Sequence, residues 1–327
     1  MSHYRTDIRS LDRSGLPVLR PLIHAYPFKP FRNYRVLSRR LQDAVLEAEV
    51  GSVLDSPDGR VLVAGEAGPP HVALVFRRLP WDSGFFGVSM GRIEYVLRAD
   101  ENREALDGIL DGCEAWCRRE GIQHVSARLD VGDTDAIAAL EDHGYRLMDA
   151  LVTYTYHPKR EPPPTLREMG ILREYRPEDA DELVAIAAES YRGFRGRFHL
   201  DPHLADDRCD ELYVEWARQC CRGRMADQIF VTEDSGGRVH GFLGFRRREP
   251  VSSVGGVPVF GGGLGACRRE SPGAYLGLIR AGTVWALDRG GVAECQTQNY
   301  NFPTVRVYET VGARYVRADY TFHAWYG

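Results

Sequence analysis

The spacing of apolar residues divides the first half of the chain into helices and strands that alternate. Apolar residues recur every three to four positions, as expected for amphipathic helices, at 16–25, 38–50 and 101–121. Runs rich in β-branched and aromatic residues, which favour strands, lie at 60–66, 71–79 and 90–97. The pattern therefore predicts an α/β arrangement, with helices placed before and after the strands.

The second half shows the same alternation. Helical spacing is found at 177–191, 206–221 and 272–291. The segment 228–249 predicts a hairpin around a Gly-Gly turn. A further glycine-rich stretch, 255–265, opens no helix, and we interpret it as a flexible hairpin that runs into a strand.

The two halves also resemble each other in order. Residues 116–157 and 285–326 both give a helix with a late Trp, a strand, a polar loop, a short helix ending in Gly and a long alternating strand. Such self-similarity predicts two copies of one structural unit. The segment 157–168 contains three consecutive prolines flanked by charges, which indicates a stiff connector. We expect one domain over 1–160 and a second over 161–327.

The short helix expected at 301–312 raises the first question about chemistry. Asn301 and Tyr308 are two helical turns apart, so they lie on nearly the same azimuth, at the edge of an apolar face. Asn301 can cap the helix by accepting from its first N–H groups. The two residues are either a cap and a core tyrosine, or they face a ligand.

Composition narrows the function classes. The chain has 327 residues, with 43% hydrophobic residues and 27% charged residues, as in ordinary globular proteins. The net charge of −4 provides no basic field for nucleic acid. No apolar run predicts a membrane span, and the start of the chain is too charged for a signal peptide. Seven cysteines without CxxC pairs indicate reduced thiols and a cytoplasmic protein.

The order of elements and the helix at 301–312 together resemble the GNAT superfamily of acyl-CoA-dependent N-acyltransferases. The family pattern N-x-x-[TA]-x-x-[VL]-Y-E-x-x-G is matched by Asn301, Thr304, Val307, Tyr308, Glu309 and Gly312. The stretches 81–93, 196–223 and 297–325 resemble the subgroup that acetylates TDP-linked 4-amino-sugars. The resemblance implies tandem GNAT-like domains of the α/β (α+β) class, each with a central mixed, mostly antiparallel sheet flanked by helices.

The resemblance also implies a site for acetyl-CoA in the second domain. A helix N-terminus offers N–H groups and a favourable dipole to a pyrophosphate. The family provides one with R/Q-x-x-G-x-G/A, and residues 270–275 keep its Gly273 but place Glu270 and Tyr275 at two other motif positions. The residues expected to bind acetyl-CoA are Ala266, Cys267, Arg268, Ser271, Gly273, Ala274, Tyr275 and Asn301.

In the family, the tyrosine at position 308 acts as a general acid. A phenol has a pKa of about 10 and a thiol about 8.5, so a phenol is protonated at neutral pH and can give its proton to a departing thiolate. The first copy has Leu140 at this position and no glycine before its helix, so we expect it to be a degenerate scaffold that walls the acceptor pocket. Glu294 and Asp201 are both candidates for the general base.

The acceptor is expected to be a small molecule. Arg197 and Phe198 offer a guanidinium for phosphate and a ring for stacking, which suits a nucleotide-sugar. His199 and His203 are separated by Pro202, which argues against a helical metal site, and no metal is expected.

The predicted function is N-acetyl transfer to a nucleotide-linked amino-deoxysugar, without nucleic-acid or membrane partners and with a homodimer allowed. The alternatives are transfer to an antibiotic or peptide amine, and a non-catalytic acyl-CoA-binding module.

Overall fold

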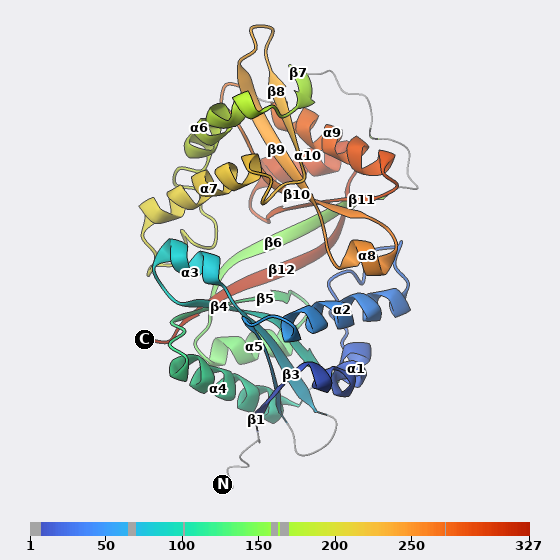
Figure 1. Ribbon diagram of the computed structural model, residues 1–327, viewed down its shortest axis with the longest axis vertical. Coiled ribbons are helices and arrows are strands. Elements are labelled where there is room, and N and C mark those ends of the chain that lie inside the picture. Colours follow the sequence, from blue (N-terminus) through green and yellow to red (C-terminus); the bar gives the residue numbers. More distant parts are fainter. Residues whose placement is uncertain (1–7, 65–69, 101, 158–162, 164–169, 272) are drawn as a thin grey trace. The chain divides into compact units, whose positions relative to one another are not determined.

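The computed structural model describes residues 8–64, 70–100, 102–157, 163, 170–271 and 273–327 (Figure 1). The chain divides into two compact units. Unit 1 comprises Met1–Ala150 with Ala318–Gly327, and unit 2 comprises Leu151–Arg317. Each unit is a mixed sheet flanked by helices, which confirms the predicted fold class.

The sheet of unit 1 is mostly antiparallel. Its strands, in spatial order, are β1 (Ile8–Leu11), β2 (Gly59–Ala64), β3 (Val72–Arg78), β4 (Met90–Arg98), β5 (His124–Asp130) and β12 (Arg314–Trp325). Neighbours run antiparallel except for β4 and β5, which are parallel. That parallel pair lies near the centre of the sheet.

Helices cover both faces of this sheet. One face packs on α1 (Leu16–Ala25) and α2 (Arg39–Leu54), and the other on α4 (Arg103–Arg119) and α5 (Thr134–Asp142). Val61 and Val63 of β2 face the first pair of helices, while Leu62 faces the second. Because both of its faces are buried, β2 is apolar at almost every position. The short helix α3 (Pro80–Phe86) connects β3 to β4.

Unit 2 repeats this plan. Its strands, in spatial order, are β6 (Arg146–Tyr156), β11 (Val292–Gln298), β10 (Val259–Cys267), β9 (Val239–Arg247), β8 (Gln228–Glu233) and β7 (Ile171–Glu174). Here β10 and β11 are the parallel pair. One face packs on α6 (Ala180–Ser190) and α7 (Asp206–Cys221), and the other on α9 (Ala274–Asp288) and α10 (Phe302–Val311).

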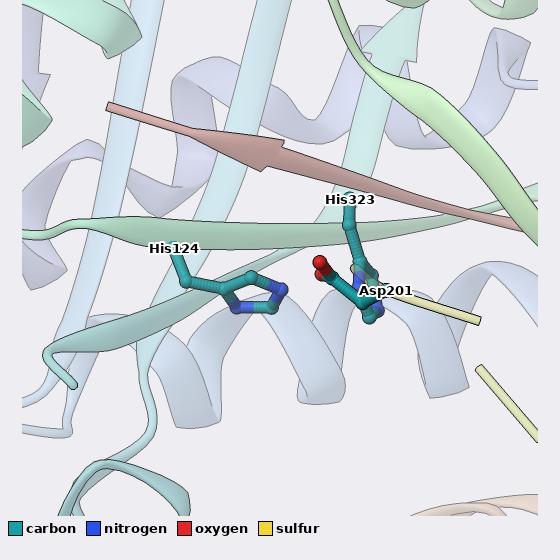
Figure 2. A group of neighbouring side chains, drawn as sticks. All are labelled: His124, Asp201 and His323. Atoms are coloured by element: carbon teal, nitrogen blue, oxygen red, sulfur yellow. The ribbon is translucent and has the colours of Figure 1, made fainter. Parts of the chain in front are cut away.

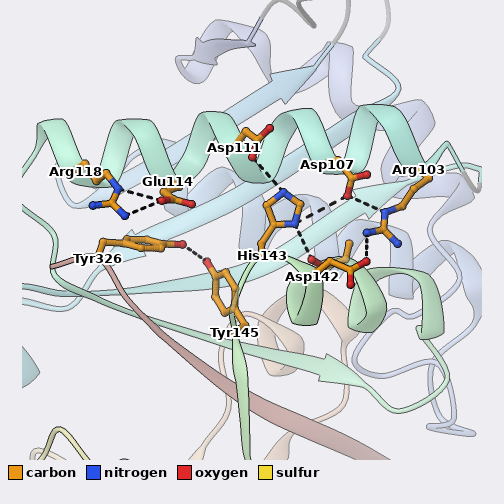
Figure 3. Close-up of polar contacts among 10 residues, drawn as sticks. Arg103, Asp107, Asp111, Glu114, Arg118, Asp142, His143, Tyr145 and Tyr326 are labelled. Atoms are coloured by element: carbon orange, nitrogen blue, oxygen red, sulfur yellow. Dashed lines mark hydrogen bonds and ion pairs between the residues drawn. The ribbon is translucent and has the colours of Figure 1, made fainter. Parts of the chain in front are cut away.

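Each of the two long strands crosses a boundary between the units. Along the sequence, β6 begins in unit 1 and continues in unit 2, and β12 begins in unit 2 and continues in unit 1. Residues 151–156 of β6 pair with β11, and residues 319–325 of β12 pair with β5. On unit 1, the rings of His124 and His323 lie 4.4 Å apart across the second pairing (Figure 2). The buried hydroxyl of Tyr326 forms a 2.7 Å hydrogen bond with that of Tyr145 and anchors the end of β12 (Figure 3).

The compact units divide after Ala150 and again after Arg317, whereas the proline-rich connector suggested a single boundary near residue 160. That connector, 157–168, lies mostly outside the described residues. The composition of the connector indicates a stiff segment. It does not predict which strands pair, because the partner of a strand depends on distant residues and is not encoded in the local pattern.

Most of the predicted elements are confirmed, and α1 and α7 have the expected bounds. The hairpin expected at 255–265 is wrong: a helical turn, α8 (Val251–Gly255), is followed by β10, which pairs with β9. The short helix α3 was not predicted. Among the described helices, none combines the length and apolarity needed to cross a membrane.

Candidate active site

The parallel strands of unit 2 are paired only at their beginnings. Residues 259–261 of β10 lie opposite residues 292–294 of β11. The register of β10 against β9 then shifts between Gly262 and Gly265, which marks a β-bulge. Beyond this point β10 has no described pairing with β11, whose other edge continues along β6. The two strands therefore part near the middle of the sheet.

Backbone groups at the end of β10 point toward this opening. Ala266 is paired with β9, and the N–H of Arg268 donates to the carbonyl of His240 at 2.8 Å. Because backbone groups alternate along a strand, the peptide groups of Gly265 and Cys267 point to the other side, toward β11. Their N–H groups are therefore directed at the opening.

The carbonyls of the same two residues are bound by the end of α6. The hydroxyl of Tyr191 donates to Gly265 at 2.7 Å, and that of Ser190 donates to Cys267 at 3.1 Å. These bonds fix the end of β10 after it has left its parallel neighbour.

Two tyrosine hydroxyls meet beside the parted strands. Tyr308 of α10 is 2% exposed, and its hydroxyl donates to the carbonyl of Gln296 at 3.1 Å. The same hydroxyl forms a hydrogen bond with that of Tyr275 from α9. Burial raises the pKa of both phenols well above the usual value. Burial also raises the pKa of the Cys295 thiol to about 12, so this cluster is uncharged at neutral pH.

Gly265 explains how the chain accommodates Tyr275, where the family pattern has a small residue. A Cβ atom at Gly265 would lie 3.2 Å from the Tyr275 ring and 2.5 Å from Leu243. The glycine thus leaves room for the ring against β10. The sequence analysis recorded Tyr275 as a departure and did not foresee this contact with Tyr308.

The start of α9 is where the sequence predicts the pyrophosphate site. Gly273 is the N-cap residue, with a left-handed φ of 94°. The N–H of Ala274 donates to the carbonyl of Ser271 at 3.2 Å, which closes a tight turn. Pro272 lies outside the described residues. The Glu270 carboxylate is ion-paired with Arg238 at 3.1 Å.

The Arg268 side chain is bound by residues of α6 and β9. Its guanidinium forms ion pairs with Glu182 at 2.8 Å and Glu189 at 3.4 Å, and its Nε donates to the carbonyl of Val239 at 3.1 Å. The side chain fastens β10 to α6, and its charge is already neutralised by two carboxylates.

Asn301 occupies the N-cap position of α10, but its side chain does not cap the helix. Its Nδ2 donates to Thr297 Oγ1 at 3.0 Å, and only its backbone carbonyl enters the helix, where it accepts from Val305. A capping side chain usually accepts from the second or third helical residue, and here the second is Pro303, which has no N–H.

Glu294, one candidate base, is nearly buried and ion-paired. Its carboxylate lies 2.9 Å from the guanidinium of Arg248. The three consecutive arginines at 246–248 are by composition typical of an exposed strand edge. Arg247 fits that interpretation through its pair with Glu249, whereas Arg248 reaches the site. The 46-residue separation of this pair gave no local signal.

The residues proposed for the acceptor lie between α6 and α7. The guanidinium of Arg197 stacks on the Phe198 ring at 4.4 Å, and Phe198 is 3% exposed. Asp201, the other candidate base, is 1% exposed and accepts from the backbone N–H of His203 at 3.1 Å. His199 Nε2 lies within hydrogen-bond distance of the Asp210 carboxylate, at 3.0 Å.

The equivalent region of unit 1 is built from charged pairs. The strands β4 and β5 are paired over residues 90–93 and 124–127, and Arg98 at the far end of β4 forms an ion pair with Asp133, the N-cap of α5. Arg32 forms an ion pair with Asp130 at 2.9 Å. Leu140, which corresponds to Tyr308, is 1% exposed.

Similarity to solved structures defines the class of fold. Over 100% of this chain and 97% of its own, a GCN5-related N-acetyltransferase from Sphaerobacter thermophilus superposes with a TM-score of 0.63 at 15% identity. A tandem GNAT protein from the clavulanic acid biosynthesis pathway gives 0.57 at 15% identity, over 98% of both chains. The chain thus has the tandem GNAT fold.

One curated relative is similar in sequence. The spore coat polysaccharide biosynthesis protein SpsD of Bacillus subtilis (strain 168) is 26% identical over 151 residues, which are 46% of this chain. The match spans about half of that relative, 49% of its length. No family model matches the sequence.

Proposed function

We propose that this chain is an N-acetyltransferase that moves an acetyl group from acetyl-CoA to the amine of a nucleotide-linked amino-deoxysugar, and that unit 2 carries the reaction. The observation that carries this proposal is the buried Tyr308 hydroxyl beside the point where β10 and β11 part. Unit 1 would then act as a scaffold and contribute no acyl-CoA site of its own.

Acetyl-CoA would bind along the end of β10. The N–H groups of Gly265 and Cys267 are directed at the opening, so they can donate to the acyl and pantetheine carbonyls. The pyrophosphate would lie at the start of α9, where Gly273 removes any side chain from its approach and the helix dipole favours negative charge. Ser271, Ala274 and Tyr275 flank that position.

In the chemical step, the neutral amine of the acceptor attacks the thioester carbonyl carbon. A backbone N–H of β10 would stabilise the negative charge on the carbonyl oxygen. As the C–S bond breaks, Tyr308 gives its proton to the sulfur, and the amine loses a proton to a base or to water. Glu294 and Asp201 both remain candidates for that base.

The acceptor assignment has independent support. The curated relative takes part, by its name, in making a polysaccharide. Arg197 offers a guanidinium that suits a diphosphate, whereas the Phe198 ring is buried and covered by Arg197, so it supports the packing of that guanidinium rather than stacking on a base.

The test is thiol release from acetyl-CoA in the presence of single amines. The panel contains TDP-4-amino-4,6-dideoxysugars, free amino sugars, an aminoglycoside and a short peptide. We expect release with the TDP-sugars at a rate well above the hydrolysis seen without an acceptor. Release with another amine alone would overturn the acceptor assignment. Binding of CoA with no turnover on any amine would instead favour a non-catalytic module.

A further inference from the structure

A chain of three polar side chains lies beside the start of α9, and two of them, His240 and Asp234, have no role in the steps above. Ser271 Oγ lies 2.8 Å from His240 Nδ1, and His240 Nε2 lies 3.2 Å from a carboxylate oxygen of Asp234. Ser271 is two residues before the N-cap Gly273, and His240 is on the adjacent strand β9. The three residues therefore connect the phosphate turn to the β8–β9 turn.

The protonation state of His240 decides which way the serine hydroxyl can donate. Asp234 fixes a proton on Nε2, since a carboxylate only accepts. In the neutral ring, Nδ1 then has to accept, and the Ser271 O–H points at it. In the imidazolium, Nδ1 donates to Ser271 Oγ, and the serine O–H is free to donate elsewhere.

We propose that His240 links CoA binding to proton uptake: the imidazolium turns the Ser271 hydroxyl toward a CoA phosphate. This inference rests on the proposed function, because it places CoA at the start of α9. Binding would take up one proton on His240, and both Ser271 and Asp234 keep their own protonation states.

Other charged groups around His240 are arranged in pairs. Glu270 pairs with Arg238 at 3.1 Å, while Arg268 pairs with Glu182 and Glu189. Hydrogen bonds, above all from the backbone N–H of Arg238, hold the pKa of Asp234 below its usual value, so it stays ionised. Because these other charges are already paired, Asp234 is the direct partner of the imidazolium.

The test is calorimetric titration of CoA into the full chain at pH 5.5, 6.5 and 8, in two buffers of different ionisation enthalpy. The difference between buffers gives the protons taken up. A phosphate monoester itself titrates near pH 6, so the comparison is with His240→Asn. Asn places an amide nitrogen near the position of Nδ1 and does not titrate. His71→Asn, an exposed histidine of unit 1, is the matched control.

For the wild type and His71→Asn, we expect CoA affinity to fall roughly tenfold more between pH 5.5 and 8 than for His240→Asn, as the loss of about one charge-assisted hydrogen bond would give. Ser271→Ala should also lose this extra dependence. Equal proton uptake by the wild type and His240→Asn would overturn the linkage while leaving the CoA site intact. If the wild type binds no CoA at any pH, the proposed function falls as well.

Discussion

Each unit contains one pair of parallel strands, and the side chains at the ends of this pair differ between the two units. In unit 1, the ends of β4 and β5 are joined to their surroundings by Arg98–Asp133 and Arg32–Asp130, and both guanidiniums lie over the Phe28 ring. In unit 2, the ends of β10 and β11 are lined by phenols, thiols and backbone N–H groups.

We interpret the charged pairs of unit 1 as structural and the groups at the strand ends of unit 2 as suited to binding a substrate. Arg98 and Asp133 are 6% and 0% exposed, so each needs the other to offset the cost of burial. Satisfied ion pairs leave little reason for a ligand to enter. Unit 2 also has an ion pair, Arg248–Glu294, but it lies where β10 and β11 are still paired. Beyond it, the uncharged groups at the ends of the two strands can exchange one hydrogen-bond partner for another at lower cost, which is what a transient substrate requires.

The largest expected effect is on turnover. Tyr308→Phe removes one hydroxyl from the cluster in unit 2 and little volume. Since general-acid catalysis contributes about 10²–10⁴-fold, kcat for acetyl transfer should fall by that factor while the Kd for CoA stays constant. Tyr145→Phe, which removes a buried hydroxyl of unit 1 (Figure 3), is the control and should keep the wild-type kcat. Wild-type turnover by Tyr308→Phe would show that the Tyr308 hydroxyl in unit 2 is not a general acid.

Next in size is the loss of the buried pair in unit 1. Arg98→Met leaves Asp133 without its cation and should lower the free energy of unfolding by about 3–5 kcal/mol. The Kd for CoA should not change. Arg103→Met breaks an exposed pair with Asp107 (Figure 3) and should have little effect on stability. Chemical denaturation and CoA titration of the three proteins check this, and weaker CoA binding by folded Arg98→Met would assign unit 1 a role in the site.

A smaller effect is expected at the phosphate turn. Gly273→Val places a branched side chain where the pyrophosphate approaches and should weaken CoA binding roughly tenfold, the equivalent of about one charge-assisted hydrogen bond. The left-handed φ of 94° also makes valine strained there, so stability falls too. Gly144→Val in unit 1 has a φ of 78° and no atom within 4 Å of a new Cβ, so it carries similar strain without touching the site. Equal CoA affinity in both variants would place the phosphates elsewhere.

The smallest effect concerns acid. Hydrogen bonds from Arg173 hold the pKa of Asp179 in unit 2 below its usual value. The contribution of this carboxylate to the stability of the folded state is complete above the pKa of an unfolded Asp, about 3.9. It is lost as pH falls through the lower pKa that Asp179 has in the folded state. Burial raises the pKa of Asp133 in unit 1, so its protonation in acid opposes unfolding.

Hydrogen exchange from pH 6 to 3, corrected for the intrinsic rates, should therefore show protection lost near Asp179 before it is lost near Asp133. Arg173→Gln should reduce the early loss in unit 2 and leave unit 1 unchanged. The reverse order in the wild type would contradict the assigned shifts.

Local periodicity was enough to predict most helices and strands, because each carries its own pattern. The bounds of α1 and α7 follow directly from it. It was not enough for α8, whose residues 251–255 give no helical signal, or for the exchange of β6 and β12, which depends on partners far away in the chain.

The candidate site divides in the same way. The position of Tyr308 on α10 follows from the sequence motif. Its contact with Tyr275, the pair formed by Arg248 and Glu294, and the bond between His240 and Ser271 arise only when elements that are distant in the sequence pack together. A motif names the residues on one element, while these contacts join residues from different elements.

The most direct test of the account is hydrogen exchange, read by mass spectrometry, with and without acetyl-CoA. If unit 2 alone binds acyl-CoA, peptides covering the end of β10, the start of α9 and α10 gain protection. Peptides covering β4, the start of α4 and α5 in unit 1 stay unchanged. Protection in unit 1 at the positions that correspond to the proposed site, or in neither unit, would contradict the claim that only unit 2 carries an acyl-CoA site.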